Sequence, residues 1–198
     1  RYNSDIERAR GYYEEADQLL KKLGGWYDWQ AQASASLGAI HNQSGIQKRK
    51  HWKDVGGDIA DQKSAFNLFS ESLNLLHKYA IDSYLPIVLD RLADLYVEIS
   101  ELGIVALDPK LKKELKSLND EMASLKLPEE QLWREHLRDS DKTFIAIDNL
   151  GRAQRLFELA FLISNQNGEP HLMFDSLVRA ASIAQKRDRS VDLEYYAI

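Results

Sequence analysis

Apolar side chains recur along this chain at the spacing of an α-helix. Two runs show the pattern most clearly: Leu68, Phe69, Leu73, Leu75 and Leu76 in the first, and Leu89, Leu92, Tyr96 and Ile99 in the second. Residues at these spacings share one face of a helix, whereas a half-buried strand would alternate apolar and polar residues. Alternating runs rich in Val, Ile and Thr do not occur, so the sequence predicts an all-α fold.

Glycine-rich and polar segments divide this pattern into helices of roughly 15–25 residues, joined as antiparallel hairpins by short turns. The expected breaks are residues 23–25, 44–57, 102–103, 125–128 and 165–168. Each proline sits where a helix could begin. Proline is tolerated in a first turn because the N–H that it lacks would have no hydrogen-bond partner there. These prolines are Pro86, Pro109, Pro128 and Pro170. Residues 45–57 carry Lys48, Arg49, Lys50, His51 and Lys53, and are predicted to be a basic insertion loop.

Three segments repeat a small residue, an aromatic residue four positions later and a small residue three positions after that. The copies are Ala9, Tyr13 and Ala16; Ala65, Phe69 and Ser72; and Ala153, Phe157 and Ala160. Positions i, i+4 and i+7 share a helix face, so the small residues let a neighbouring helix approach while the ring fills the space beside them. A weaker copy has Leu111, Leu115 and Leu118.

A second motif alternates with the first. Leu37-Gly38 is followed by His41, and Leu92-Ala93 is followed by Tyr96. With these two motifs in alternating order, the chain resembles the tetratricopeptide repeat family, in which one helix of each hairpin carries Leu-Gly and its partner carries the Ala, aromatic, Ala face. The copies begin 56, 46 and 42 residues apart, against about 34 in that family. The resemblance implies stacked hairpins forming a right-handed α-solenoid over residues 1–198, as a single repeat domain.

Composition excludes several classes of protein. The chain of 198 residues has no cysteine, so disulfides, thiolate metal sites and cysteine nucleophiles are excluded. Its 26 Lys and Arg against 31 Asp and Glu give a net charge of −5, which argues against nucleic-acid binding. No apolar run reaches the ~18 residues that span a membrane. Neither a signal peptide nor a helix terminator frames the ends, so we expect a cytoplasmic fragment of a longer protein.

Candidate chemistry is sparse. No two of the five histidines are three or four positions apart, so no helix presents a pair of metal-ligating histidines. Phosphate-binding glycine loops and nucleophilic-serine turns are missing as well. The neighbours Glu135 and His136 are the only faint catalytic candidate, and His41 is expected to be a packing residue. We therefore expect no metal, no cofactor and no enzymatic activity.

Two surface features have a second interpretation. The basic run with Trp52 could contact nucleic-acid phosphates while the ring stacks on a base, but the acidic residues that follow favour a solvated loop. Trp26 and Trp29, at i and i+3, are expected to plug a hairpin or its end. If this pair were exposed, it would mark a partner surface instead.

The family resemblance also nominates residues that would line the concave face of the solenoid. They are Gln32, Asn42 and Gln43 on one helix, Asp90, Asp94 and Glu98 on the next, and Asp175 and Arg179 on the third. This face would be largely acidic, which favours basic or amine-bearing peptides. Simple solvation of the carboxylates is the alternative. The Lys, Arg and Asn arrangement with which family members clamp a C-terminal carboxylate is missing, so such tails are not expected to bind.

The sequence therefore predicts a non-catalytic interaction or scaffold module that binds a peptide or helical segment of a partner protein. The alternative is a ligand-sensing regulatory repeat region of a larger signalling ATPase or transcription regulator. Partners are expected to be proteins or peptides, with basic ones favoured, and neither a membrane nor nucleic acid.

Overall fold

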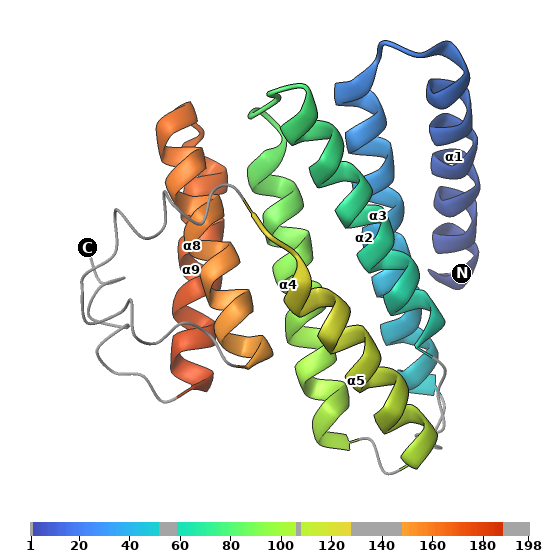
Figure 1. The fold of residues 1–198 in the computed structure, drawn as a ribbon, viewed down its shortest axis with the longest axis vertical. Coiled ribbons are helices and arrows are strands. Elements are labelled where there is room, and N and C mark those ends of the chain that lie inside the picture. Colours follow the sequence, from blue (N-terminus) through green and yellow to red (C-terminus); the bar gives the residue numbers. More distant parts are fainter. Residues whose placement is uncertain (1, 52–58, 106–107, 128–147, 188–198) are drawn as a thin grey trace. The chain divides into compact units, whose positions relative to one another are not determined.

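The computed structural model describes residues 2–51, 59–105, 108–127 and 148–187, and these residues form seven helices and no strand (Figure 1). The helices are α1 (Tyr2–Leu23), α2 (Tyr27–His51), α3 (Ala60–Lys78), α4 (Leu85–Val105), α5 (Pro109–Ser124), α8 (Asn149–Asn167) and α9 (Pro170–Lys186). The all-α prediction is confirmed for this part of the chain. No helix within it is long and apolar enough to cross a membrane.

The chain divides into two compact units. The first comprises Arg1–Tyr84 and Glu101–Leu125, and the second comprises Leu85–Ser100 and Lys126–Ile198. In the first unit α1 packs on α2 and α2 packs on α3, while in the second α8 packs on α9. In each of these three pairs the helices follow one another directly in the chain, as short connections favour. The single-domain solenoid over residues 1–198 stays a prediction.

Helix ends follow the local signals that the sequence carries. Pro109 and Pro170 open α5 and α9, and Pro86 is the second residue of α4. The Asp148 carboxylate accepts a hydrogen bond of 2.6 Å from the Gly151 N–H and so caps α8. Gly168 ends that helix with a φ of 72°, a left-handed conformation that favours glycine. The predicted turn at residues 24–25 is also confirmed, whereas Pro128 lies outside the described residues.

Two predicted breaks are wrong in position. Residues 45–51, expected to begin the basic insertion loop, form the last turns of α2, and residues 52–57 of the predicted loop lie outside the described residues. Gly45 lies inside this helix, and an added Cβ there would collide with the Gln62 amide of α3, so the glycine serves close packing rather than a turn. Similarly, α4 continues past Gly103 to Val105.

The core of the first unit is built on the predicted repeat motif. Ala65, Phe69 and Ser72 of α3 are completely buried, and the Phe69 ring lies against Gly38 of α2. A Cβ on Gly38 would come within 2.8 Å of that ring and 3.2 Å of the Ala65 carbonyl oxygen. The Ser72 hydroxyl donates a hydrogen bond of 2.8 Å to the Ala31 carbonyl oxygen of α2. The Leu-Gly motif of α2 thus faces the Ala, aromatic, small motif of α3.

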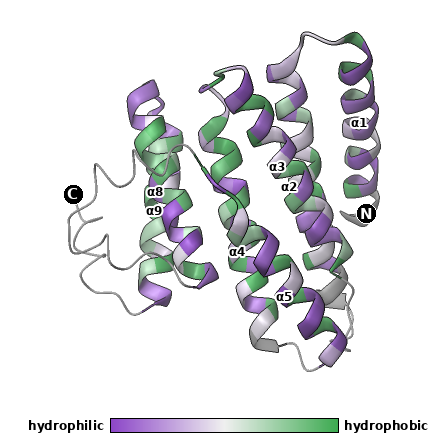
Figure 2. Cartoon of the chain, in the orientation of Figure 1, coloured by the Kyte–Doolittle hydropathy of each residue, from purple (hydrophilic) through white to green (hydrophobic). Residues whose placement is uncertain are grey.

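The remaining copies of the motif behave in two ways. Ala153, Phe157 and Ala160 of α8 are buried like the α3 copy, and Leu111, Leu115 and Leu118 of α5 also face inward. The α1 copy differs because Tyr13 is 39% exposed. Figure 2 shows the contrast in composition between α1, which is mainly hydrophilic, and the largely hydrophobic α4. The first copy is therefore only partly used for packing within the chain.

Replacing glycine by alanine should have opposite effects at two positions, because Gly38 contacts the Phe69 ring and Gly11 has open space around it. Gly38→Ala should destabilise the first unit by about 1–3 kcal/mol, because the added methyl overpacks against the completely buried Phe69 ring. Gly11→Ala, at an exposed position of α1 with no atom within 4 Å of an added Cβ, should instead stabilise by up to about 1 kcal/mol, as alanine is the better helix former. Urea unfolding followed by circular dichroism measures both. A Gly38→Ala protein at least as stable as wild type would contradict this packing.

Candidate functional site

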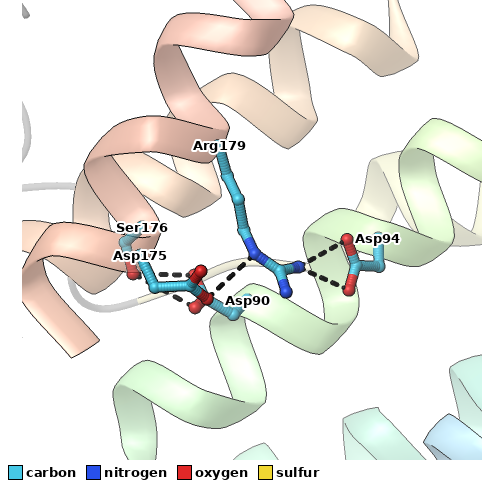
Figure 3. A network of polar contacts seen from close by, with 5 residues as sticks. All are labelled: Asp90, Asp94, Asp175, Ser176 and Arg179. Carbon is cyan, nitrogen blue, oxygen red and sulfur yellow. Dashed lines mark hydrogen bonds and ion pairs between the residues drawn. The ribbon is translucent and has the colours of Figure 1, made fainter. Parts of the chain in front are cut away.

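Four of the eight nominated residues meet in the second unit, where α4 faces α9 (Figure 3). Asp90 and Asp94 lie one turn apart on α4, and Asp175 and Arg179 lie one turn apart on α9. Residues four apart share a helix face, so each helix presents both of its charged residues to the other. Ser176, which the sequence analysis missed, completes the group. We call these five residues the Asp–Arg cluster.

Hydrogen bonds join the two helices directly. The Ser176 hydroxyl lies 3.0 and 3.1 Å from the two carboxylate oxygens of Asp90. Arg179 Nη1 donates to both oxygens of Asp94 at 2.9 and 2.8 Å, and its Nε lies 3.0 Å from Asp175 Oδ2. The guanidinium therefore bridges a carboxylate of α4 and a carboxylate of its own helix, as the dashed lines in Figure 3 show.

Phe157, the aromatic residue of the repeat motif in α8, contacts the arginine of this cluster. The guanidinium carbon of Arg179 lies 5.7 Å from the centre of the Phe157 ring, the buried aromatic residue of α8. A cation at this distance from a ring is attracted to its face. The aromatic residue that fills the core thus also helps to position the arginine of the cluster.

The two carboxylates of α4 have different surroundings. Asp90 is buried, with 9% of its surface exposed, and this burial raises its pKa to about 7. The hydrogen bond from Ser176 and the charge of Arg179 lower the pKa, while the charges of Asp175 and Asp94 raise it further. The Asp94 side chain is instead 49% exposed and ion-paired. One carboxylate is therefore an internal group that gains a proton near neutral pH, and the other is open to solvent.

Partial burial lowers the pKa of Arg179, but the carboxylates of Asp94, Asp175 and Asp90 outweigh it, so the pKa is raised overall. The guanidinium stays charged at all physiological pH values. With all three carboxylates ionised, the cluster carries an excess of two negative charges.

An exposed apolar pair adjoins the cluster on α9. Phe174 and Val178, one turn apart, are 66% and 50% exposed, and the Asp175 side chain between them is 56% exposed. Positions 174, 175 and 178 share one face of a helix. This face therefore combines an aromatic ring, a branched apolar side chain and a carboxylate, and we call it the α9 face.

The other nominated residues lie apart from the cluster. Glu98 is half-buried on α4, one turn beyond Asp94. Gln32 and Gln43 are half-buried on α2 in the first unit, and Asn42 of the same helix is buried. The expected continuous face of eight residues is therefore not shown, and an open position for Asn42 is wrong because its side chain packs inside the first unit.

Further predicted features can be placed as well. Trp26 and Trp29 were expected to plug a hairpin, which is wrong, since they are 56% and 55% exposed at the turn between α1 and α2. His41 is buried, with its Nδ1 3.3 Å from the Asp61 carboxylate, as expected of a packing residue. Glu135, His136 and the basic run beyond His51 lie outside the described residues. Among those that are described, no three His, Asp or Glu side chains could hold a metal ion.

Comparison with known proteins leaves the family open. No protein-family model and no curated protein matches the chain. A solved structure described as the DHF79 filament matches with 17% sequence identity and a TM-score of 0.41, over 96% of this chain and 91% of the other. This TM-score is too low to support any statement about fold or function.

The buried Asp90 predicts a fall in stability as the pH rises. The folded state keeps the Asp90 proton up to about pH 7, whereas in the unfolded chain an aspartate loses it near pH 4. Its stabilising contribution is therefore complete below about pH 4 and is lost as the pH rises to about 7. Wild type should therefore lose about 2–3 kcal/mol of unfolding free energy between pH 5 and pH 8 that Asp90→Asn does not lose. The difference in stability between the two proteins shifts by that amount in favour of the variant.

Urea unfolding at pH 5, 6, 7 and 8 measures this difference. Asp120→Asn, at an exposed position of α5, is the matched control and should follow the wild-type pH dependence. Ser176→Ala should shift the loss of stability to higher pH, because the hydroxyl donates to the ionised carboxylate. Parallel curves for wild type and Asp90→Asn would show that Asp90 titrates as an ordinary surface carboxylate.

Proposed function

We propose that this chain is a non-catalytic protein-interaction module of the tetratricopeptide type, and that it binds a basic amphipathic helix of a partner protein on the α9 face. The observation that carries the proposal is the exposed apolar pair Phe174 and Val178 beside the acidic excess of the Asp–Arg cluster. An apolar strip flanked by charge is the surface that amphipathic helices recognise.

The repeat interpretation is supported by packing in the first unit. Gly38 of α2 receives the Phe69 ring of α3, which is the relation between the two alternating motifs that the family resemblance implies. Small residues at such contacts let helix axes come close. We propose that this hairpin packing extends along the chain as a stacked, right-handed solenoid.

The chemistry of the partner follows from the α9 face. Phe174 and Val178 offer a contact for two apolar side chains one turn apart on a partner helix, which would remove both from water. Asp175 and Asp94 each share Arg179 and remain half-exposed, so a partner Lys or Arg can reach their outer oxygens. Asp90 lies beneath them and takes no direct part, because it is buried against Ser176.

A designed peptide tests this proposal without knowledge of the natural partner. The probe is a fluorescein-labelled helical peptide of about 15 residues, with leucines at i, i+3, i+4 and i+7 and lysines beside them. Fluorescence anisotropy should show saturable binding, weakened at least about tenfold by Phe174→Ala combined with Asp175→Asn, because the anchor and a facing charge are both lost. The same peptide with glutamates in place of lysines should bind much more weakly, since it would face like charges.

The matched control for the double variant is Trp29→Ala with Asp120→Asn, which removes an exposed aromatic and a carboxylate from the first unit. It should bind the lysine peptide like wild type. Equal binding of the two peptides, or an unchanged affinity of the Phe174 and Asp175 variant, would refute the assignment to the α9 face.

A further inference from the structure

Helix α1 has an apolar stripe on the face that points away from the rest of the first unit. Tyr12, Leu19 and Leu23 are 63%, 54% and 62% exposed, and Ala16 lies between them. The spacings of 4, 3 and 4 residues are those of the a and d positions of a coiled coil, with Ala16 and Leu23 at a and Tyr12 and Leu19 at d. We call these four residues the α1 stripe.

The opposite face of α1 already holds the helix in place. The Ser34 hydroxyl of α2 donates to the Asp17 carboxylate at 3.3 Å, and Lys21 bridges Asp17 and Glu71 of α3 at 2.8 Å each. The α1 stripe is therefore not needed to attach α1 to its own chain. Three large apolar side chains left more than half exposed on one helix face mark an interaction surface.

From the charges beside the stripe, we infer that α1 pairs with α1 of a second copy of this chain, antiparallel and about a two-fold axis. In the heptad set by the stripe, the g positions are Arg8, Glu15 and Lys22, all exposed. In an antiparallel pair g positions face each other across the seam, and opposite charges there select partner and orientation. Glu15 of each copy then faces Lys22 of the other, giving two ion pairs.

The same charges argue against the alternative arrangements. A shift of one heptad would place Glu15 against its own counterpart and Arg8 against Lys22, which are like charges. In a parallel pair, g positions face e positions, and Glu15 would meet Leu20, which offers no charge. The antiparallel register also packs Tyr12 against Leu23 and the small Ala16 against Leu19, so that large side chains have room in the seam.

The stripe is short, so the dimer should be weak. From Tyr12 to Leu23 it extends about 18 Å at ~1.5 Å per residue. It offers less area than the roughly 1,200–2,000 Å² of a standard stable interface, and we expect a dissociation constant in the micromolar range. Unlike the peptide contact on the α9 face, this interface lies in the first unit and does not depend on the proposed function.

Analytical ultracentrifugation of the chain from about 5 to 500 μM, a range that brackets micromolar dissociation, should show a reversible monomer–dimer equilibrium. Leu19→Glu should abolish the dimer while the far-UV circular dichroism and unfolding midpoint stay as in wild type, since Leu19 is exposed in the monomer. Phe174→Ala should leave the dimer unchanged, which separates this interface from the α9 face. A chain that stays monomeric throughout, or a dimer unaffected by Leu19→Glu, would overturn the inference.

A charge reversal tests the antiparallel register. Glu15→Lys and Lys22→Glu should each weaken dimerisation roughly 3- to 30-fold, because two exposed ion pairs become two like-charge contacts. The double variant restores both pairs with exchanged signs, so its dissociation constant should return to within about threefold of wild type. Failure of the double variant to recover would exclude the antiparallel α1 pair.

Discussion

Close contact between helices at small residues, filled by buried phenylalanine rings, is the constraint on which this structure depends. Phe69 fits against Gly38, where even one added methyl group would meet the ring at 2.8 Å. Interiors are packed so densely that such a site tolerates neither a larger residue nor an empty space. Phe157 fills the corresponding position of α8 and also lies beneath the guanidinium of Arg179. The residue that packs the second unit therefore also shapes its polar surface.

The Asp–Arg cluster combines attachment of two helices with an open charged surface. Asp90 and Ser176 form its buried part. Here Asp90 takes up a proton near pH 7 instead of pairing with a counter-ion. Asp94, Asp175 and Arg179 form its outer part, in which one cation is shared by two half-exposed carboxylates. Exposed ion pairs contribute little to stability, so the outer residues can change partners at small cost. This division is consistent with the proposed function, in which the surface stays folded while a charged partner binds.

Helices and many of their ends were predictable because their signals are local. Prolines 109 and 170, the Gly24-Gly25 turn and Gly168 act through the backbone of their own segment. The predicted break at Gly45 was wrong, because this glycine is needed for the contact with Gln62 on another helix, and composition does not reveal such a contact. The exposure of Trp26 and Trp29 likewise depends on what packs around them.

The site was predictable only in part, because contacts between distant segments leave no local signal in the sequence. Family spacing placed Asp90, Asp94, Asp175 and Arg179 on one surface, and the structure brings these four together. Asp90 is hydrogen-bonded by Ser176, which is 86 residues away and has no sequence signal beyond its place between Asp175 and Arg179. Asn42 was nominated by the same spacing and is buried, because spacing along a helix does not say which neighbour covers the face.

A titration followed by nuclear magnetic resonance can map whether the α9 face receives the proposed basic amphipathic helix. Unlabelled lysine–leucine peptide would be added to ¹⁵N-labelled chain while the backbone amide shifts are followed. If the helix binds there, the largest shifts should occur in residues 171–182 of α9 and around Asp94 of α4, with little change in α2 and α3. Shifts concentrated in the first unit, or no saturable shifts at all, would contradict it.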